Sequence, residues 1–284
     1  MSVNIYDPHH PFDPPAEYLE RYEKIIEDIP LPNYVEGELN NKPVYQEADR
    51  HGAYDDPTRW PYAEMSDFDH RLVRAAYWAM CDLIDNQVGR MLDVLRETGQ
   101  LDNTIVIFTS DHREMLGDHG MYCKGPYFYE PAIRVPLLVS WPGVIVPGRS
   151  SALVELTDLA QTLLDAAQQP HHPGMQGKSF WPMLTGKADR DHHRDDIYCE
   201  YYYANIRRTP PHPHLTMVRT ESHKLVLDHP SSTGEIYDLE ADPSETVNRW
   251  DDPACERLKT QLLIRLCNRM AWTVDPLPER RARH

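Results

Sequence analysis

The chain is predicted to be an α/β protein, and three observations support this class. Apolar residues recur at helical spacing across residues 66–99. Residues 105–108 then form a continuous apolar run, which is typical of a strand buried on both faces of a sheet. A second run of this kind follows at residues 135–139. Helix, strand, loop and strand in this order is the pattern of α/β folds.

Length and composition narrow the class of protein further. With 284 residues and 40% hydrophobic content, the chain is long enough for one large α/β domain, alone or with an appendage. The balance of 29 Lys and Arg against 45 Asp and Glu gives a net charge of -16. This charge argues against nucleic acid or a membrane surface as a partner, since both require a basic footprint.

Membrane insertion and export are not indicated by the sequence. No apolar stretch approaches the ~20 residues of a membrane span, and no signal peptide follows Met1. The five cysteines are widely spaced and form no C-x-x-C pair, so neither a disulfide framework nor a zinc cluster is expected. We therefore expect a cytoplasmic chain, or a periplasmic or secreted one if a signal peptide lies upstream.

The N-terminal third is expected to be mostly irregular. Residues 2–6 look like a strand that breaks at a Pro-rich turn, and a domain seldom begins inside a core strand, so part of the fold is expected upstream of Met1. A short helix is predicted at residues 14–28, followed by a long ordered surface loop up to about residue 65. Ser66 or Asp67 is the expected N-cap of the long helix that follows.

The C-terminal part is predicted to form a small antiparallel α+β subdomain. A third helix is expected at residues 155–167, and a Pro-, His- and Gly-rich stretch at 170–196 marks a boundary. Beyond it, short strands are predicted at residues 215–219, 224–227 and 235–239, with an amphipathic helix at 255–271. The expected domains are residues 1–190 and 191–284.

Candidate chemistry lies at the end of the strand at residues 104–109. Asp111 and His112 offer a carboxylate oxygen and an imidazole nitrogen, and open α/β sheets bind ligands where their strands end. Lys124 follows after a short loop and would place a cation beside an anionic substrate. An isolated Asp-His pair more often caps a turn, but the Gly-rich turns and the lysine downstream favour a metal site.

Several motifs resemble the sulfatase family of the alkaline-phosphatase-like superfamily. The segments S-D-H-R-E-M-L-G-D-H-G, K-G-P-Y-F-Y-E-P-A-I-R-V-P-L and W-P-G are similar to the second half of bacterial sulfatases. DPHHPFDPP resembles the family's H-x-P element, and VELTDLAQTLLDAA, GMQGKSFWPMLTG and EIYDLEADPSETVN resemble its later helix and C-terminal subdomain. Together these motifs cover nearly the whole chain.

The resemblance implies a fold and a set of site residues. The fold would be part of an alkaline-phosphatase-like sandwich, with a mainly parallel sheet flanked by helices and a small C-terminal antiparallel α+β subdomain. Asp111 and His112 match two of the family's metal ligands, and Lys124 matches a lysine that contacts the sulfate ester. His9 matches a histidine that touches the leaving-group or sulfate oxygen, with His10 as its competitor.

The implied activity is metal-assisted hydrolysis of a small-molecule or sugar sulfate ester. Oxygen ligands favour Ca²⁺ as the single divalent ion, while Mg²⁺ also suits them and an imidazole admits Mn²⁺. Further substrate-binding candidates are His10, Arg113, His119 and Arg134, although His119 is equally well explained as a residue that supports the loop. The paired histidines at 171–172 and 192–193 are interpreted as surface residues.

The chain departs from the family pattern in two ways. It contains no C-x-P-x-R or S-x-P-x-R element, the source of the family's formylglycine nucleophile, and lacks the two acidic metal ligands near the family's start. Arg113 replaces a usual Gly, at a cost of about 1 kcal/mol or more if that position needs φ > 0.

These departures predict that the isolated chain binds metal weakly and turns over little. The missing N-terminal half would come from upstream sequence or from another chain. A second copy of this chain, in a homo-oligomer, is an alternative partner. The alternatives are a phosphonate monoester or phosphodiester hydrolase of the same superfamily, and a non-catalytic pseudoenzyme or partner subunit.

Overall fold

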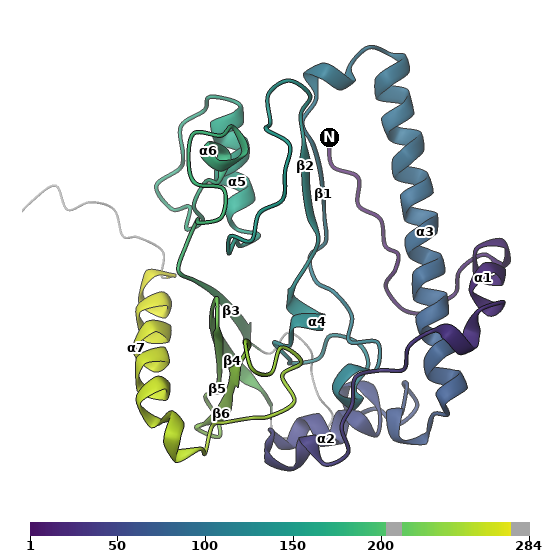
Figure 1. Ribbon diagram of the computed structural model, residues 1–284, viewed down its shortest axis with the longest axis vertical. Helices are drawn as coiled ribbons and strands as arrows, with labels where there is room; N and C mark the ends of the chain where they lie inside the picture. Colours follow the sequence, from purple (N-terminus) through teal and green to yellow (C-terminus); the bar gives the residue numbers. More distant parts are fainter. Residues whose placement is uncertain (203–211, 274–284) are drawn as a thin grey trace, which may run out of the picture. The chain divides into compact units, whose positions relative to one another are not determined.

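A computed structural model describes residues 1–202 and 212–273 of the chain (Figure 1). The described chain divides into two compact units, one formed by residues 1–142 and the other by residues 143–202 together with 213–273. This division differs from the domain boundary expected near residue 190.

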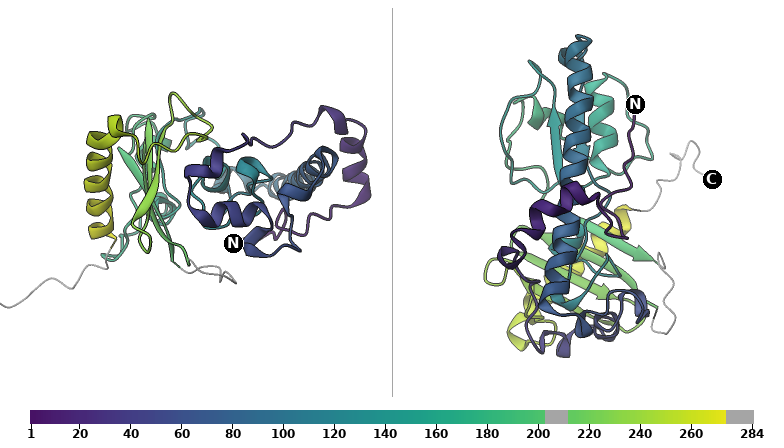
Figure 2. Two further views of the ribbon diagram at one scale, coloured as in Figure 1. Left: turned by 90° about the horizontal axis from the view of Figure 1, so that it is seen from below. Right: turned by 90° about the vertical axis from the view of Figure 1, so that its right-hand side faces the viewer.

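The long helix α3 (Asp67–Glu97) organises the first unit. Ser66 is its N-cap: the Ser66 hydroxyl accepts from the backbone N–H of Asp69 at 3.3 Å, and the Asp69 carboxylate accepts from the N–H of Ser66 at 2.8 Å. This capping box satisfies two N–H groups that have no partner inside the helix. The shorter helix α1 (Ala16–Glu23) packs beside α3 (Figure 2). Tyr22 of α1 donates to Asp82 of α3 at 2.7 Å.

The segment expected to be a surface loop up to residue 65 is instead a series of short helices with buried side chains. These are η1 (Ile26–Asp28), η2 (Glu38–Asn41), α2 (Val44–Arg50), η3 (Ala53–Asp55) and η4 (Tyr62–Glu64). Gln46 and Asp49 of α2 are fully buried. Tyr129 donates to Gln46 at 2.7 Å and Tyr127 donates to Asp49, so both buried polar side chains have hydrogen-bond partners. These partners lie far along the chain, so local sequence patterns could not reveal the burial.

The strands of the first unit are shorter and more exposed than expected. After η5 (Leu101–Asn103), β1 (Val106–Thr109) pairs antiparallel with β2 (Leu137–Ser140). Phe108 is 38% and Leu138 is 60% exposed, so this pair is not buried on both faces in the described structure. Residues 1–6, predicted to be a strand, are exposed and lie outside any strand of the described structure.

The second unit contains an antiparallel sheet covered on one face by a helix (Figures 1 and 2). The sheet follows chain order: β3 (Asp196–Tyr202), β4 (His214–Thr220), β5 (His223–Asp228) and β6 (Thr233–Asp238). After η7 (Pro253–Cys255), α7 (Glu256–Trp272) buries Leu262 and Leu266 against sheet residues that include Val218 and Ile236. The predicted antiparallel α+β subdomain is confirmed, with β3 as an additional strand.

Every strand pair in the described residues is antiparallel, in contrast to the mainly parallel sheet that was expected. Strands that follow one another closely along the chain can pair antiparallel without a crossover helix, and this is how β4, β5 and β6 are connected. No described helix is long and apolar enough to cross a membrane.

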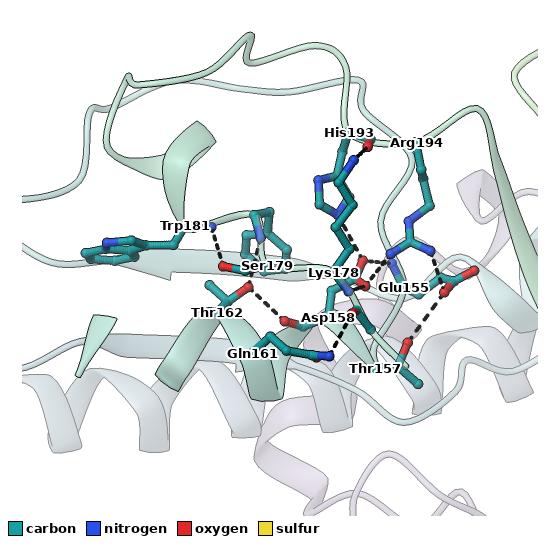
Figure 3. A network of polar contacts seen from close by, with 12 residues as sticks. Glu155, Thr157, Asp158, Gln161, Thr162, Lys178, Ser179, Trp181, His193 and Arg194 are labelled. Carbon is teal, nitrogen blue, oxygen red and sulfur yellow. Dashed lines mark hydrogen bonds and ion pairs between the residues drawn. The ribbon is translucent and has the colours of Figure 1, made fainter. Parts of the chain in front are cut away.

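A buried polar network joins α5 (Asp158–Ala166) and the region of α6 (Trp181–Leu184) to the start of β3 (Figure 3). Asp158 is fully buried and accepts from the N–H of Lys178 at 2.7 Å and from Arg194. Glu155 accepts from Arg194 at 2.7 Å. These contacts explain why residues 155–190 belong to the same compact unit as the C-terminal sheet.

One of the histidines interpreted as a surface residue belongs to this network. His193 is only 4% exposed and its Nε2 lies 3.3 Å from the Asp158 carboxylate, whereas the side chain of His192 is 64% exposed. The surface interpretation is therefore wrong for His193, because a buried carboxylate more than 30 residues upstream provides a partner that no local pattern indicates.

Candidate active site

His9 and Lys124, the two predicted catalytic residues, are in direct contact. The Nζ atom of Lys124 lies 2.7 Å from Nε2 of His9, across a sequence separation of 115 residues. Nδ1 of His9 lies 2.8 Å from the carbonyl oxygen of His10, which can only accept, so Nδ1 carries a proton and Nε2 accepts from Lys124. An ammonium has three protons, so two remain available for the oxygens of an anion.

The two predicted metal ligands lie beside this pair. The imidazole rings of His112 and His9 are 6.4 Å apart between centroids. Nδ1 of His112 lies 2.8 Å from the carbonyl oxygen of Arg113, an arrangement that leaves Nε2 unprotonated and able to bind a metal. The side chain of Asp111 is 86% exposed, and its Oδ2 atom lies 3.7 Å from Nε2 of His112.

This spacing fits joint coordination of one divalent ion. Two ligands at about 2.3–2.6 Å from a Ca²⁺ ion and at right angles to each other lie roughly 3.3–3.7 Å apart. The donor atoms of Asp111 and His112 are at the upper end of this range. A carboxylate and an imidazole also suit Mn²⁺.

Backbone contacts hold the loop that carries these residues. The hydroxyl of Ser110 donates to the carbonyl of His112 at 2.6 Å, and the N–H of Arg113 donates to the carbonyl of Ala132 at 2.9 Å. The N–H of Met115 donates to the carbonyl of Cys123 at 2.9 Å, which fixes the position of the neighbouring Lys124. The loop residues after β1 are thereby tied to the segment that carries the lysine.

A second cluster adjoins the His9–Lys124 pair and was not identified from the sequence. Nδ1 of His10 lies 3.8 Å from Sγ of Cys123, and ligand atoms of His10, Glu114 and Cys123 all lie within 4.8 Å of one another. Burial raises the pKa of Glu114 to about 7, and burial likewise raises the pKa of the Cys123 thiol. Burial, followed by the charges of His9 and Lys124, lowers the pKa of His10 to about 4.

The remaining substrate-binding candidates lie in different surroundings. Arg113 is exposed, and its guanidinium donates to the carbonyl of Arg134 at 3.1 Å. The residues described with a left-handed φ do not include Arg113, so the backbone strain considered for this position is absent. His119 is 1% exposed, contacts Glu38 at 2.9 Å and stacks on Tyr129, so its position supports packing of the loop rather than contact with a substrate.

Comparisons with known proteins identify the family of the chain. The sulfatase family model matches residues 1–169, and a model described as N-sulphoglucosamine sulphohydrolase, C-terminal, matches residues 117–271. The chain belongs to the sulfatase family. Membership confirms the resemblance inferred from the motifs and implies a divalent metal.

Individual sulfatases show the extent of the sequence similarity. Arylsulfatase K of Gallus gallus is 34% identical over 185 residues, which cover 63% of this chain and 34% of that protein. N-acetylglucosamine-6-O-sulfatase of Bacteroides thetaiotaomicron is 34% identical over 176 residues, covering 61% of this chain and 31% of that protein. The matched segments thus cover about a third of the length of these two sulfatases. An arylsulfatase of Clostridium perfringens, matched over 87% of this chain at 29% identity, is covered to 48% of its length, so the chain spans about half the length of that relative.

Among solved structures, a phosphonate monoester hydrolase from Silicibacter pomeroyi superposes with a TM-score of 0.81 at 27% identity. The match covers 94% of this chain and 55% of that structure. This similarity confirms the alkaline-phosphatase-like fold class that the sulfatase motifs implied.

Proposed function

We propose that the chain contributes the anion-binding and metal-binding residues of a site that hydrolyses sulfate monoesters. The observation that carries this proposal is the 2.7 Å contact between His9 and Lys124, with His112 beside it. Two residue types suited to a sulfate group converge from distant parts of the sequence, next to a pair of metal-binding side chains.

The chemistry follows from the charges of the substrate. A sulfate monoester carries its negative charge on non-bridging oxygens, and the two remaining protons of the Lys124 ammonium can bind them. Nε2 of His9 lies beside the same anion position, and an imidazole that has taken a proton from solvent can deliver it to the leaving oxygen while Lys124 keeps its charge. When bound by Asp111 and His112, a divalent ion supplies further neutralisation of the sulfate charge.

The proposed substrate is a sugar sulfate and the proposed ion is Ca²⁺. N-acetylglucosamine-6-O-sulfatase is among the relatives, which supports a sugar as the alcohol part of the ester. The exposed carboxylate and the 3.7 Å spacing of the donor atoms support Ca²⁺, with Mg²⁺ or Mn²⁺ as alternatives. The family's formylglycine motif is absent from the 284 residues, so no nucleophilic step is assigned to any of them.

Calorimetric titration of N-acetylglucosamine 6-sulfate into the chain, with Ca²⁺ present, tests the proposal. A hydrogen bond to a charged group is worth about 1.5–3 kcal/mol, so Lys124→Ala should weaken binding by roughly 10- to 150-fold. The exposed Lys187 provides a control, and Lys187→Ala should leave the affinity unchanged. Equal affinity of the Lys124→Ala variant and the unaltered chain would contradict the proposed role of the lysine.

Hydrolysis of a phosphonate monoester is the second candidate, favoured by the structural similarity to the Silicibacter pomeroyi enzyme. The same cationic pair can bind a phosphonate, so geometry alone does not separate the two activities. Calorimetric affinities of the chain for 4-nitrophenyl sulfate and for 4-nitrophenyl phenylphosphonate should be compared in parallel, with Ca²⁺ present. Tighter binding of the sulfate supports the first candidate, and tighter binding of the phosphonate supports the second.

A further inference from the structure

We propose that His10, Glu114 and Cys123 form a second metal site, selective for a thiophilic divalent ion such as Zn²⁺. The inference does not depend on the proposed sulfatase activity. It rests on an imidazole, a carboxylate and a thiol that converge within 4.8 Å of one another from separate segments of the first unit.

The distances suit a tetrahedral ion. Zinc binds sulfur at about 2.3 Å and nitrogen or oxygen at about 2.0–2.2 Å, which places neighbouring ligand atoms roughly 3.3–3.7 Å apart. Nδ1 of His10 and Sγ of Cys123 are 3.8 Å apart in the structure. Closing the longest separation, at most 4.8 Å, requires side-chain movements of the order of 1 Å.

The surrounding structure holds the three ligands in place. Cys123 is fully buried against Ala53 and Tyr122, and the backbone hydrogen bond from Met115 to Cys123 sets the thiol beside the neighbouring Glu114. The ring of Trp60 packs edge-on against His10 at 5.1 Å. Ligands whose positions are fixed by packing lose little freedom when an ion binds.

Charge and ligand type set the selectivity of the cluster. Lys124 and Arg59 lie close enough to His10 to oppose a cation, but a metal-bound thiolate and carboxylate together contribute two negative charges. The sulfur selects Zn²⁺ or Co²⁺ over Ca²⁺, whereas the carboxylate and imidazole of Asp111 and His112 lack a soft ligand. Three protein ligands would leave one tetrahedral position of the ion for water or another ligand. The His9 ring lies 4.0 Å from the ring of His10, so the cluster adjoins the His9–Lys124 pair.

Titration of the purified chain with Co²⁺ provides a direct test, because a bound thiolate gives a sulfur-to-cobalt charge-transfer band in the near ultraviolet. We expect the band to saturate at one equivalent, to be removed by Zn²⁺ and to persist with an equal concentration of Ca²⁺. Cys123→Ser should abolish it. His10→Asn, on the partly exposed N-terminal segment, should weaken Co²⁺ binding at least about 10- to 100-fold.

Two control variants separate this site from the rest of the chain. Cys267→Ser removes an exposed thiol of α7, and Asp111→Asn removes a ligand of the other predicted metal site. Both should keep the band, whatever happens to sulfate-ester binding. Absence of the band in the unaltered chain would overturn the proposal, as would its persistence in Cys123→Ser and His10→Asn or its loss in Cys267→Ser.

Discussion

Replacing Asp158 by Ala should strongly destabilise the second unit. The buried carboxylate accepts from the N–H groups of Glu155 at 2.8 Å and Lys178 at 2.7 Å, pairs with Arg194, and lies 3.3 Å from His193 (Figure 3). Alanine would leave two backbone donors and a largely buried guanidinium without this partner. Removing one member of a buried ion pair costs about 3–5 kcal/mol, and we expect a loss in free energy of unfolding of this size.

The assay is urea denaturation followed by circular dichroism, with Asp195→Ala as the matched control. The Asp195 side chain is 76% exposed and lies 3.8 Å from His192, so its removal should change the free energy of unfolding by less than about 0.5 kcal/mol. A loss below about 1 kcal/mol for Asp158→Ala would refute the conclusion that this carboxylate holds the network together.

The contribution of Asp158 to the free energy of unfolding should also depend on pH. Burial raises the pKa of Asp158, but the adjacent His193 imidazole and hydrogen bonds from the N–H groups of Glu155 and Lys178 outweigh this effect and hold the pKa below its usual range. Stability from the ionised form is therefore fully present above the unfolded pKa of about 3.9, and is lost as the pH falls through the lower folded value. The stability gap between the chain and Asp158→Asn should narrow only below about pH 4.

Three further predictions address other parts of the chain. Ser66→Ala removes the N-cap of α3 and should lower the free energy of unfolding by about 1 kcal/mol in urea denaturation, whereas Ser66→Asp should retain it. Lys224→Met leaves the buried Glu245 carboxylate without the ammonium 2.5 Å away and should cost about 3–5 kcal/mol in the same assay, with partial recovery in Lys224→Met/Glu245→Leu. Ellman's reagent should label the exposed Cys267 rapidly and the buried, raised-pKa Cys123 slowly, and loss of the fast phase in Cys123→Ser would contradict this order.

Local patterns in the sequence predicted the elements whose periodicity is strong. The long helix α3, its Ser66 cap, the strands β4 to β6 and the helix α7 all lie close to their expected positions. The short helix α2 was missed because its buried polar residues Gln46 and Asp49 find their partners in tyrosines about 80 residues downstream. The N-terminal apolar residues look like a strand, but residues 1–6 have no strand partner in the described structure.

The sequence predicted individual residues of the candidate site but not the contacts between them. Motif resemblance singled out His9, Asp111, His112 and Lys124, but only the structure brings His9 and Lys124 to 2.7 Å. The ligand cluster that includes Cys123 has no sequence signature, because its members are separated by up to 113 residues. Metal motifs can be detected in a sequence when the ligands are a few residues apart, and this cluster offers no such spacing.

The His9–Lys124 contact makes ligand binding and chain closure interdependent. Bringing together residues 115 positions apart costs about 4 kcal/mol of loop-closure entropy, more than the roughly 1 kcal/mol that one hydrogen bond returns. Packing of the rest of the first unit must therefore provide most of the free energy that offsets this entropy cost. An anion that contacts both side chains would connect the N-terminal segment to the loop that carries Lys124 and stabilise this contact. At a concentration 100 times its dissociation constant it would add about 2.7 kcal/mol of stability. Protease cleavage near the exposed residues 1–6 would then report occupancy of the site.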